Sequence, residues 1–194
     1  MNKYMQSYRY ILFICFFTAG LFSQQEKFNI YAGVERCQVC HETPEMGNQH
    51  GVWKDTKHAK AYETLLTEES ALIVQEKGYS TPAYETPECL SCHVTGYNNP
   101  DAIFAENFTI QNGVQCESCH GAGESYRKEI IMCDREVSIV NGLILPKPDD
   151  CLTCHNEKSP RYKPFDYEVY YKKMEHHKNP EYKCETEEDE DEDW

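Results

Sequence analysis

Four copies of one five-residue pattern constrain this chain more than any other feature of its sequence. Each copy has two cysteines separated by two residues, and a histidine directly follows the second cysteine. In chain order, motifs 1 to 4 are Cys37–His41, Cys89–His93, Cys116–His120 and Cys151–His155. A single C-x-x-C pair is compatible with a redox dithiol or with half of a zinc ribbon. Zinc ribbons do not explain four pairs that each end in histidine.

The pattern C-x-x-C-H is typical of covalent haem attachment. The two thiols add across the vinyl groups of the porphyrin, and the adjacent histidine is placed to bind the iron from one face. The sequence therefore predicts four covalently bound haems c, with iron as the metal. We number these haems 1 to 4, like their motifs. The attaching cysteines are Cys37, Cys40, Cys89, Cys92, Cys116, Cys119, Cys151 and Cys154, and the proximal iron ligands are His41, His93, His120 and His155.

The expected cofactors also bear on the fold. A chain of 194 residues favours one domain. Hydrophobic residues make up 40% of the chain and 14 residues are tyrosine, so a large core of side chains is not expected. We expect the porphyrins to form the core and the apoprotein to fold poorly. Because the motifs start 52, 27 and 35 residues apart, the chain is not a tandem repeat. The predicted class is mainly α with much irregular structure, compact and packed around haem.

The N-terminus has the pattern of a secretory signal peptide. Lys3 and Arg9 give a basic start, an apolar run extends from Ile11 to Phe22, and Ser23 precedes a polar stretch. We expect cleavage near Ser23, so that residues 24–180 form a soluble, periplasmic tetrahaem domain. The alternative is an uncleaved membrane anchor, which the shortness of the run disfavours. No later apolar stretch is long enough to span a bilayer.

The chain is strongly acidic, with a formal net charge of −14. Residues 181–194 form an acidic tail, and eight of the last ten residues are Asp or Glu. Such a run is typical of a solvated, disordered tail. The alternative is that it steers the protein toward a redox partner with a basic docking face. This charge disfavours nucleic acid and anionic membrane surfaces as partners.

Periodicity predicts a few helices between the motifs. One helical face would carry His58, Ala61, Tyr62 and Leu65. A new helix is expected to start after Thr67 and to end at Gly78. A short hairpin is compatible with residues 103–110, and a short helix with residues 134–141, ending at Gly142. In the last part of the chain, a helix would present Tyr167, Tyr170, Tyr171 and Met174 on one face.

Each iron also needs a ligand on its second face, or else that face stays open to small molecules. The histidines outside the motifs are His50, His58, His176 and His177. His58 is the favoured distal ligand because it falls on an apolar helical face. Helical spacing favours His177 over His176. His50 and Met132 are further candidates, although an exposed loop position and ordinary packing would also explain them.

Several stretches resemble the tetrahaem cytochrome c-554 family. The matching stretches are Trp53–Ala61, Glu88–Val94 and Gly113–Gly121, and all four motifs occur in the same order. The resemblance implies a mostly helical fold in which haems stack in close pairs. It implies His58 as one distal ligand and, in the C-terminal helix, His176 rather than His177 as another. It also implies a five-coordinate iron on His93.

The chain departs from the family pattern after motif 3. The family has a further distal histidine there, but residues 124–132 contain none. Met132 or His50 would have to replace it, or the position is open. Cys133 and Cys184 lie outside the motifs, and they could pair, stay free or link two chains.

Three functions are compatible with these features. The first is a periplasmic carrier that passes electrons between redox partners through closely packed haems, and we favour it over an enzyme. The second is a reductase for nitric oxide or a related nitrogen oxide at an open haem on His93. The third is a module of a larger redox assembly that docks through the acidic tail.

Overall fold

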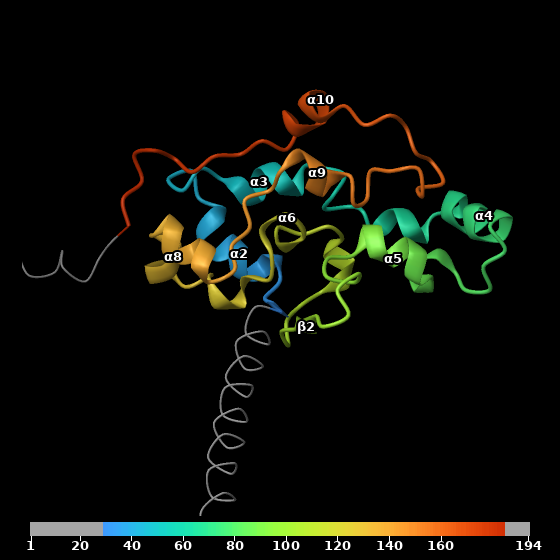
Figure 1. The fold of residues 1–194 in the computed structure, drawn as a ribbon, viewed down its shortest axis with the longest axis horizontal. Helices are drawn as coiled ribbons and strands as arrows, with labels where there is room; N and C mark the ends of the chain where they lie inside the picture. The colour runs from blue at the N-terminus through green and yellow to red at the C-terminus, as the bar shows by residue number, and fades with distance from the viewer. Residues whose placement is uncertain (1–28, 185–194) are drawn as a thin grey trace, which may run out of the picture.

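A computed structural model describes residues 29–184 of the chain (Figure 1). Short helices joined by turns dominate this part, and a single pair of short strands provides its sheet. The predicted class, mainly α with much irregular structure, is therefore confirmed. The expected signal peptide at residues 1–23 and residues 185–194 of the expected acidic tail at 181–194 lie outside the described residues.

The longer elements are α2 (Val34–His41), α3 (Gln49–Lys54), α4 (Glu68–Glu76), α5 (Pro87–His93), α8 (Arg135–Val140) and α10 (Tyr167–Tyr171). The single-turn helices are α6 (Glu117–His120), α7 (Glu129–Met132) and α9 (Pro148–Cys151). The 3₁₀ turns are η1 (Glu63–Leu66), η2 (Ala83–Glu85), η3 (Ile110–Asn112) and η4 (Gly123–Ser125). Motifs 1, 2 and 3 end the helices α2, α5 and α6, and motif 4 begins at the end of α9. A haem motif thus lies at the C-terminal end of each of these helices.

Side chains alone form only a small core. It packs α4 and α5 against η1 and η2, and its members are Tyr62, Leu65, Val74, Ala83, Leu90 and Val94. Elsewhere large apolar side chains stay exposed, among them Val39, Ile130 and Val140. Buried apolar surface is the main source of folding stability. The scarcity of buried apolar side chains agrees with the expectation that haem supplies much of the core.

The expected hairpin at residues 103–110 is not formed. Instead β2 (Ile103–Phe104) pairs in parallel with β1 (Ile30–Tyr31), so Ile103 lies beside Ile30. The N–H of Ile103 donates to the carbonyl of Asn29 at 2.8 Å. Aromatic packing favours this partner, because the Phe104 ring lies 5.7 Å from that of Tyr31 and 4.5 Å from that of Phe108.

The helix expected around His58 is also wrong, since turns and the 3₁₀ turn η1 replace it. The carbonyl of His58 accepts hydrogen bonds from Ala61 at 3.1 Å and from Val114 at 3.0 Å, so it is shared with a distant segment. That tertiary contact overrides the local periodicity. Ala61, Tyr62 and Leu65 are nevertheless buried together, as their spacing predicted.

Two other helix predictions hold. Helix α4 starts after Thr67, whose side chain accepts from the Ser70 N–H, and the chain leaves it at Gly78 with φ +74°. Helix α8 starts after Asp134 and is followed by Gly142 with φ +104°. The glycine allows the left-handed conformation that ends a helix at little steric cost.

The last predicted helix is shorter than expected. Helix α10 ends at Tyr171, so Met174, His176 and His177 lie in the segment that follows it. We call residues 172–184 the C-terminal strap. Figure 1 shows the chain after α9 running along one side of the molecule. The strap ends at a disulfide between Cys184 and Cys133, which settles the pairing that the sequence left open.

We expect replacement of Cys133 and Cys184 by serine to lower the thermal unfolding midpoint of the holoprotein by several degrees. The disulfide joins residues 51 positions apart, and closing such a loop removes about 4 kcal/mol of unfolded-chain entropy. Calorimetry would measure the midpoint. Each single variant should match the double variant, because each removes the same bond. An unchanged midpoint in all three would contradict the prediction.

Candidate haem-binding site

The fold brings the four motifs together into one connected cluster. The thiol of Cys37 in motif 1 lies close enough to Cys116 in motif 3 for the two to shift each other's pKa, and the same holds for Cys92 in motif 2 and Cys154 in motif 4. Cys119 of motif 3 lies close enough to Cys151 of motif 4 to interact electrostatically. These neighbouring cysteines link motif 1 to motif 3, motif 3 to motif 4, and motif 4 to motif 2.

The eight motif cysteines are all free thiols, whereas Cys133 and Cys184 are bonded to each other. Their surroundings shift the thiol pKa in different directions. The hydrogen bond with Cys154 lowers the pKa of Cys92 to about 6, and burial raises the pKa of Cys119 to about 11. Free thiols in pairs are what thioether attachment of a porphyrin requires.

A cavity lies where motifs 2, 3 and 4 meet. Its lining includes Ser91 and Cys92 of motif 2, Glu117 and Ser118 of motif 3, and Thr153 and Cys154 of motif 4. Tyr31, Val94, Gly96, Asn98 and Val114 complete it. Open space is therefore present beside cysteines of motifs 2 and 4.

Three proximal histidines are oriented through Nδ1. His93 donates to the carbonyl of Ala61 at 2.6 Å and His120 to that of Ile144 at 3.1 Å. His41 lies 3.2 Å from Oε1 of Gln49. An acceptor at Nδ1 places the ring proton there and leaves the Nε2 lone pair for a metal. These hydrogen bonds suit the predicted role of the three rings as iron ligands.

Burial favours the neutral form of several histidine rings in this site. It lowers the pKa of His41 and of His120. It also lowers the pKa of His58 to about 4, with a smaller contribution from His155. Only the neutral ring has a lone pair to give to a metal, so this shift suits a ligand at neutral pH.

In two pairs of histidine rings, the centroids lie about as far apart as one metal atom between them would require. The rings of His58 and His155 have centroids 5.9 Å apart, and those of His120 and His176 are 6.1 Å apart. Metal–imidazole bonds are about 2 Å long, so two rings on opposite sides of one metal have centroids about 6 Å apart. The structure thus brings His58 together with motif 4, and His176 together with motif 3.

A second observation supports the pair at His58. Its Nδ1 atom is buried and has no hydrogen-bond partner among residues 29–184. A buried polar atom without a partner is costly, so such atoms are rare unless something else binds them. A metal or a group brought by a cofactor would remove this cost. The donor set and this unpaired atom both fit haem.

The other distal candidates contact different partners. His50, buried on α3, has its ring 5.5 Å from that of Trp53 and 3.9 Å from Glu42. His177 is exposed and lies 3.1 Å from Glu175. Met132 accepts a weak hydrogen bond from Ser138. Within the described residues, no second histidine ring is paired with His41 or His93 in this way. The roles of all these residues stay predictions.

Two polar residues that the motif analysis did not single out hold motifs 1 and 3 together. Glu117 is 2% exposed, and its carboxylate accepts from the backbone N–H groups of Ala32 at 2.7 Å, Gly33 at 2.8 Å and Gly123 at 2.6 Å. Gln115 is buried as well and accepts from Val34 N–H at 2.8 Å. Burial raises the pKa of Glu117, while its three donors oppose that rise. Its place between the cysteines of motif 3 gave no signal for this role.

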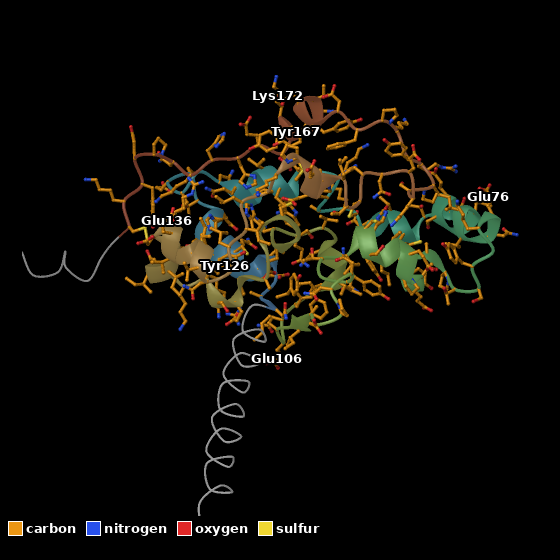
Figure 2. All side chains as sticks on the ribbon, viewed as in Figure 1. Glu76, Glu106, Tyr126, Glu136, Tyr167 and Lys172 are labelled. Atoms are coloured by element: carbon orange, nitrogen blue, oxygen red, sulfur yellow. A yellow bond between two sulfur atoms is a disulfide. The ribbon has the colours of Figure 1, made fainter. Side chains whose placement is uncertain are left out.

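A buried tyrosine closes the same region. The hydroxyl of Tyr126 donates to the carbonyls of His120 at 3.1 Å and Gly121 at 2.9 Å. Figure 2 shows Tyr126 in the interior near α2, whereas Glu76 lies at the outer end of α4. Gly121 is needed here for close packing, because a side chain there would meet the carbonyl of Gly142. The close approach at this glycine is therefore to the backbone of Gly142.

Part of this cluster is similar to known proteins. Residues 36–121 match the family model described as cytochrome c554 and c-prime. Cytochrome c-554 of Nitrosomonas europaea is 33% identical over 104 residues, which are 50% of this chain and 40% of the relative. The chain thus spans less than half of the length of the relative that it matches. No solved structure matches the chain. The family match includes motifs 1 to 3 and His58, whereas motif 4 and His176 lie beyond it.

We expect Glu117→Gln to lower the free energy of unfolding by about 2 kcal/mol, because an amide N–H₂ would replace one of the acceptors that face buried N–H groups. Denaturant titration of the holoprotein would measure it. Glu76→Gln is the matched control, since Glu76 is exposed at the end of α4. Equal stability of the two variants would contradict this role of Glu117.

Proposed function

We propose that this protein is a tetrahaem c-type cytochrome that carries electrons between redox partners in the periplasm. The match of residues 36–121 to the family model described as cytochrome c554 and c-prime supports this proposal. The observation that carries the proposal is the continuous cluster of the four motifs. Haem supplies one-electron chemistry when bound. The chain contributes spacing, axial ligands and electrostatics, and it needs no acid–base pair or nucleophile.

Each set of residues has a defined role in this proposal. The motif cysteines attach the porphyrins and fix their mutual distances. The motif histidines bind iron from one side, with Nδ1 of His41, His93 and His120 held by protein oxygens. His58 and His176 supply second ligands to haems 4 and 3, which the ring distances support. Irons with two imidazole ligands are closed to small molecules and suited to electron transfer.

Location and partners are part of the same proposal. The pattern at residues 1–23 predicts export, and residues 24–180 would form the mature tetrahaem domain. Within residues 29–184, no helix is both long enough and apolar enough to cross a membrane. The acidic tail favours redox partners that present a basic face. Haem attachment in an exported protein is consistent with the disulfide between Cys133 and Cys184.

The holoprotein is expected to carry four haems per chain. Intact-mass measurement together with a haem assay would count them. Replacing both cysteines of one motif by alanine should remove one haem and leave the others, because each motif attaches its own porphyrin. The Cys151→Ala/Cys154→Ala variant tests the motif outside the family match. Retention of four haems in that variant would contradict attachment at motif 4.

A second function is favoured by one observation. The ring of His93 is anchored through Nδ1 to Ala61 and Thr64, but no second imidazole is paired with it among residues 29–184. An iron held there would keep a face free for a small molecule. We propose as the alternative that haem 2 binds and reduces nitric oxide or a related nitrogen oxide, with electrons supplied by the other haems.

Electron paramagnetic resonance would separate the two functions. The oxidised holoprotein should show a high-spin signal from at least one iron, and the reduced protein should bind nitric oxide at one or two haems per chain. The irons on His120 and His155 should stay low-spin, because each has an opposing imidazole. Low-spin signals alone, with no bound nitric oxide, would eliminate the reductase and leave the carrier.

A further inference from the structure

One side chain connects motif 1 to the C-terminal strap. Gln49 is the first residue of α3, eight positions after His41. Its Oε1 atom lies 3.2 Å from Nδ1 of His41. Its amide nitrogen donates to the carbonyls of Met46 at 2.7 Å and of His177 at 3.1 Å. The amide thus uses its acceptor on a proximal histidine and both of its donors on backbone, one of them in the strap.

The strap lies backbone to backbone on the loop that precedes Gln49. The N–H of Asn179 donates to the carbonyl of Met46 at 3.1 Å. Gly47 has φ +107°, and a Cβ there would collide with the carbonyl oxygen of His177. Glycine at this position is therefore required both by its conformation and by the close approach of the strap.

This contact sits beside a candidate iron ligand. His176 precedes the peptide carbonyl that Gln49 holds, and its ring faces that of His120 at 6.1 Å. Nδ1 of His176 is in turn bound to the carbonyl of Met174 at 2.8 Å. Two contacts, at His177 and Asn179, thus fix the strap immediately after His176, and the disulfide fixes its end.

We infer that Gln49 is a positioning residue for two haems at once. Through its carbonyl oxygen it sets the electron-donating strength of His41 toward haem 1, and through its amide N–H it holds His176 in place on haem 3. The inference rests on the proposed haem attachment and deepens it, because it links the potential of one haem to the ligation of another.

The two halves of the amide predict different effects. An acceptor on the Nδ1 proton makes imidazole a stronger donor and favours the oxidised iron. Loss of that acceptor should favour reduction, and a carboxylate in its place should oppose it. The N–H donors are absent from both leucine and glutamate, so both replacements should loosen the strap and weaken the bond from His176.

The test compares Gln49→Leu with Gln49→Glu in the holoprotein. In a spectroscopic redox titration, one of the four haems should become easier to reduce in the leucine variant and harder to reduce in the glutamate variant. We expect each change to be on the order of tenfold in the ferric–ferrous equilibrium. In both variants, low-spin intensity should be lost from another haem, and the reduced protein should take up additional carbon monoxide.

Two further variants isolate the parts. Gly47→Ala keeps the Gln49 side chain but displaces the strap, so it should raise carbon monoxide uptake with little effect on the potential of haem 1. Gln75→Leu, on the exposed face of α4, is the matched control and should change neither readout. Shifts of the same sign in the leucine and glutamate variants would indicate a merely structural role and overturn the inference.

The number of attached haems distinguishes a failure of this inference from a failure of the proposed function. If the mass of the unaltered protein shows no haem on motif 1 or motif 3, the proposed function itself fails. If all four haems are attached and neither Gln49 variant moves a potential or a spin state, only the role of Gln49 is refuted.

Discussion

The scarcity of buried apolar side chains is the constraint on which the rest of this structure depends. Among the described residues, the main cluster of buried apolar side chains lies around α4 and α5. Only a few, such as Val34, Ala122 and Tyr126, are buried around motifs 1 and 3. A chain that buries so little apolar surface has little to offset the entropy of ordering its loops. Porphyrins attached at the four motifs, as proposed, would supply that surface, and folding and cofactor attachment would then be coupled.

Where apolar packing is weak, hydrogen bonds to backbone define the local geometry. Glu117 accepts from three N–H groups, two in the segment between β1 and α2 and one in η4, so one carboxylate fixes motif 1 against motif 3. Gln49 does the same between motif 1 and the strap. Ala61 and Ile144 hold the rings of His93 and His120 through single carbonyls. Such contacts orient ligands without needing a core, and they matter most where the ligand must meet a metal at a fixed distance.

The sequence predicted the parts of the structure that local chemistry determines. The caps at Thr67 and Asp134 marked the starts of α4 and α8 because a side-chain oxygen there satisfies free N–H groups. The helix predicted around His58 does not form, because the His58 carbonyl accepts a hydrogen bond from Val114, 56 residues away. No local sequence pattern reveals that partner. The strand at Ile103 was assigned the wrong partner for the same reason. The motifs identified the cofactor, but the pairing of His176 with His120 depends on a strap path that spacing does not encode.

The order of the motifs in space differs from their order in the chain, and this has a consequence for the path of electrons. Contacts run from motif 1 to motif 3, then 4, then 2. Motifs 3 and 4, whose histidines face a second imidazole, are the inner pair. Motifs 1 and 2, whose histidines have no second histidine ring near them within residues 29–184, lie at the two ends of this order.

With haems attached as proposed, the two irons that have an imidazole on each face would lie in the middle of the row of haems. The irons with one free face would lie at its two ends, and we call this row the relay. Electron exchange with a partner and binding of a small molecule could then take place at opposite ends of one relay. The carrier and the reductase would therefore be two uses of the same arrangement, and they would differ in what reaches the end that carries His93.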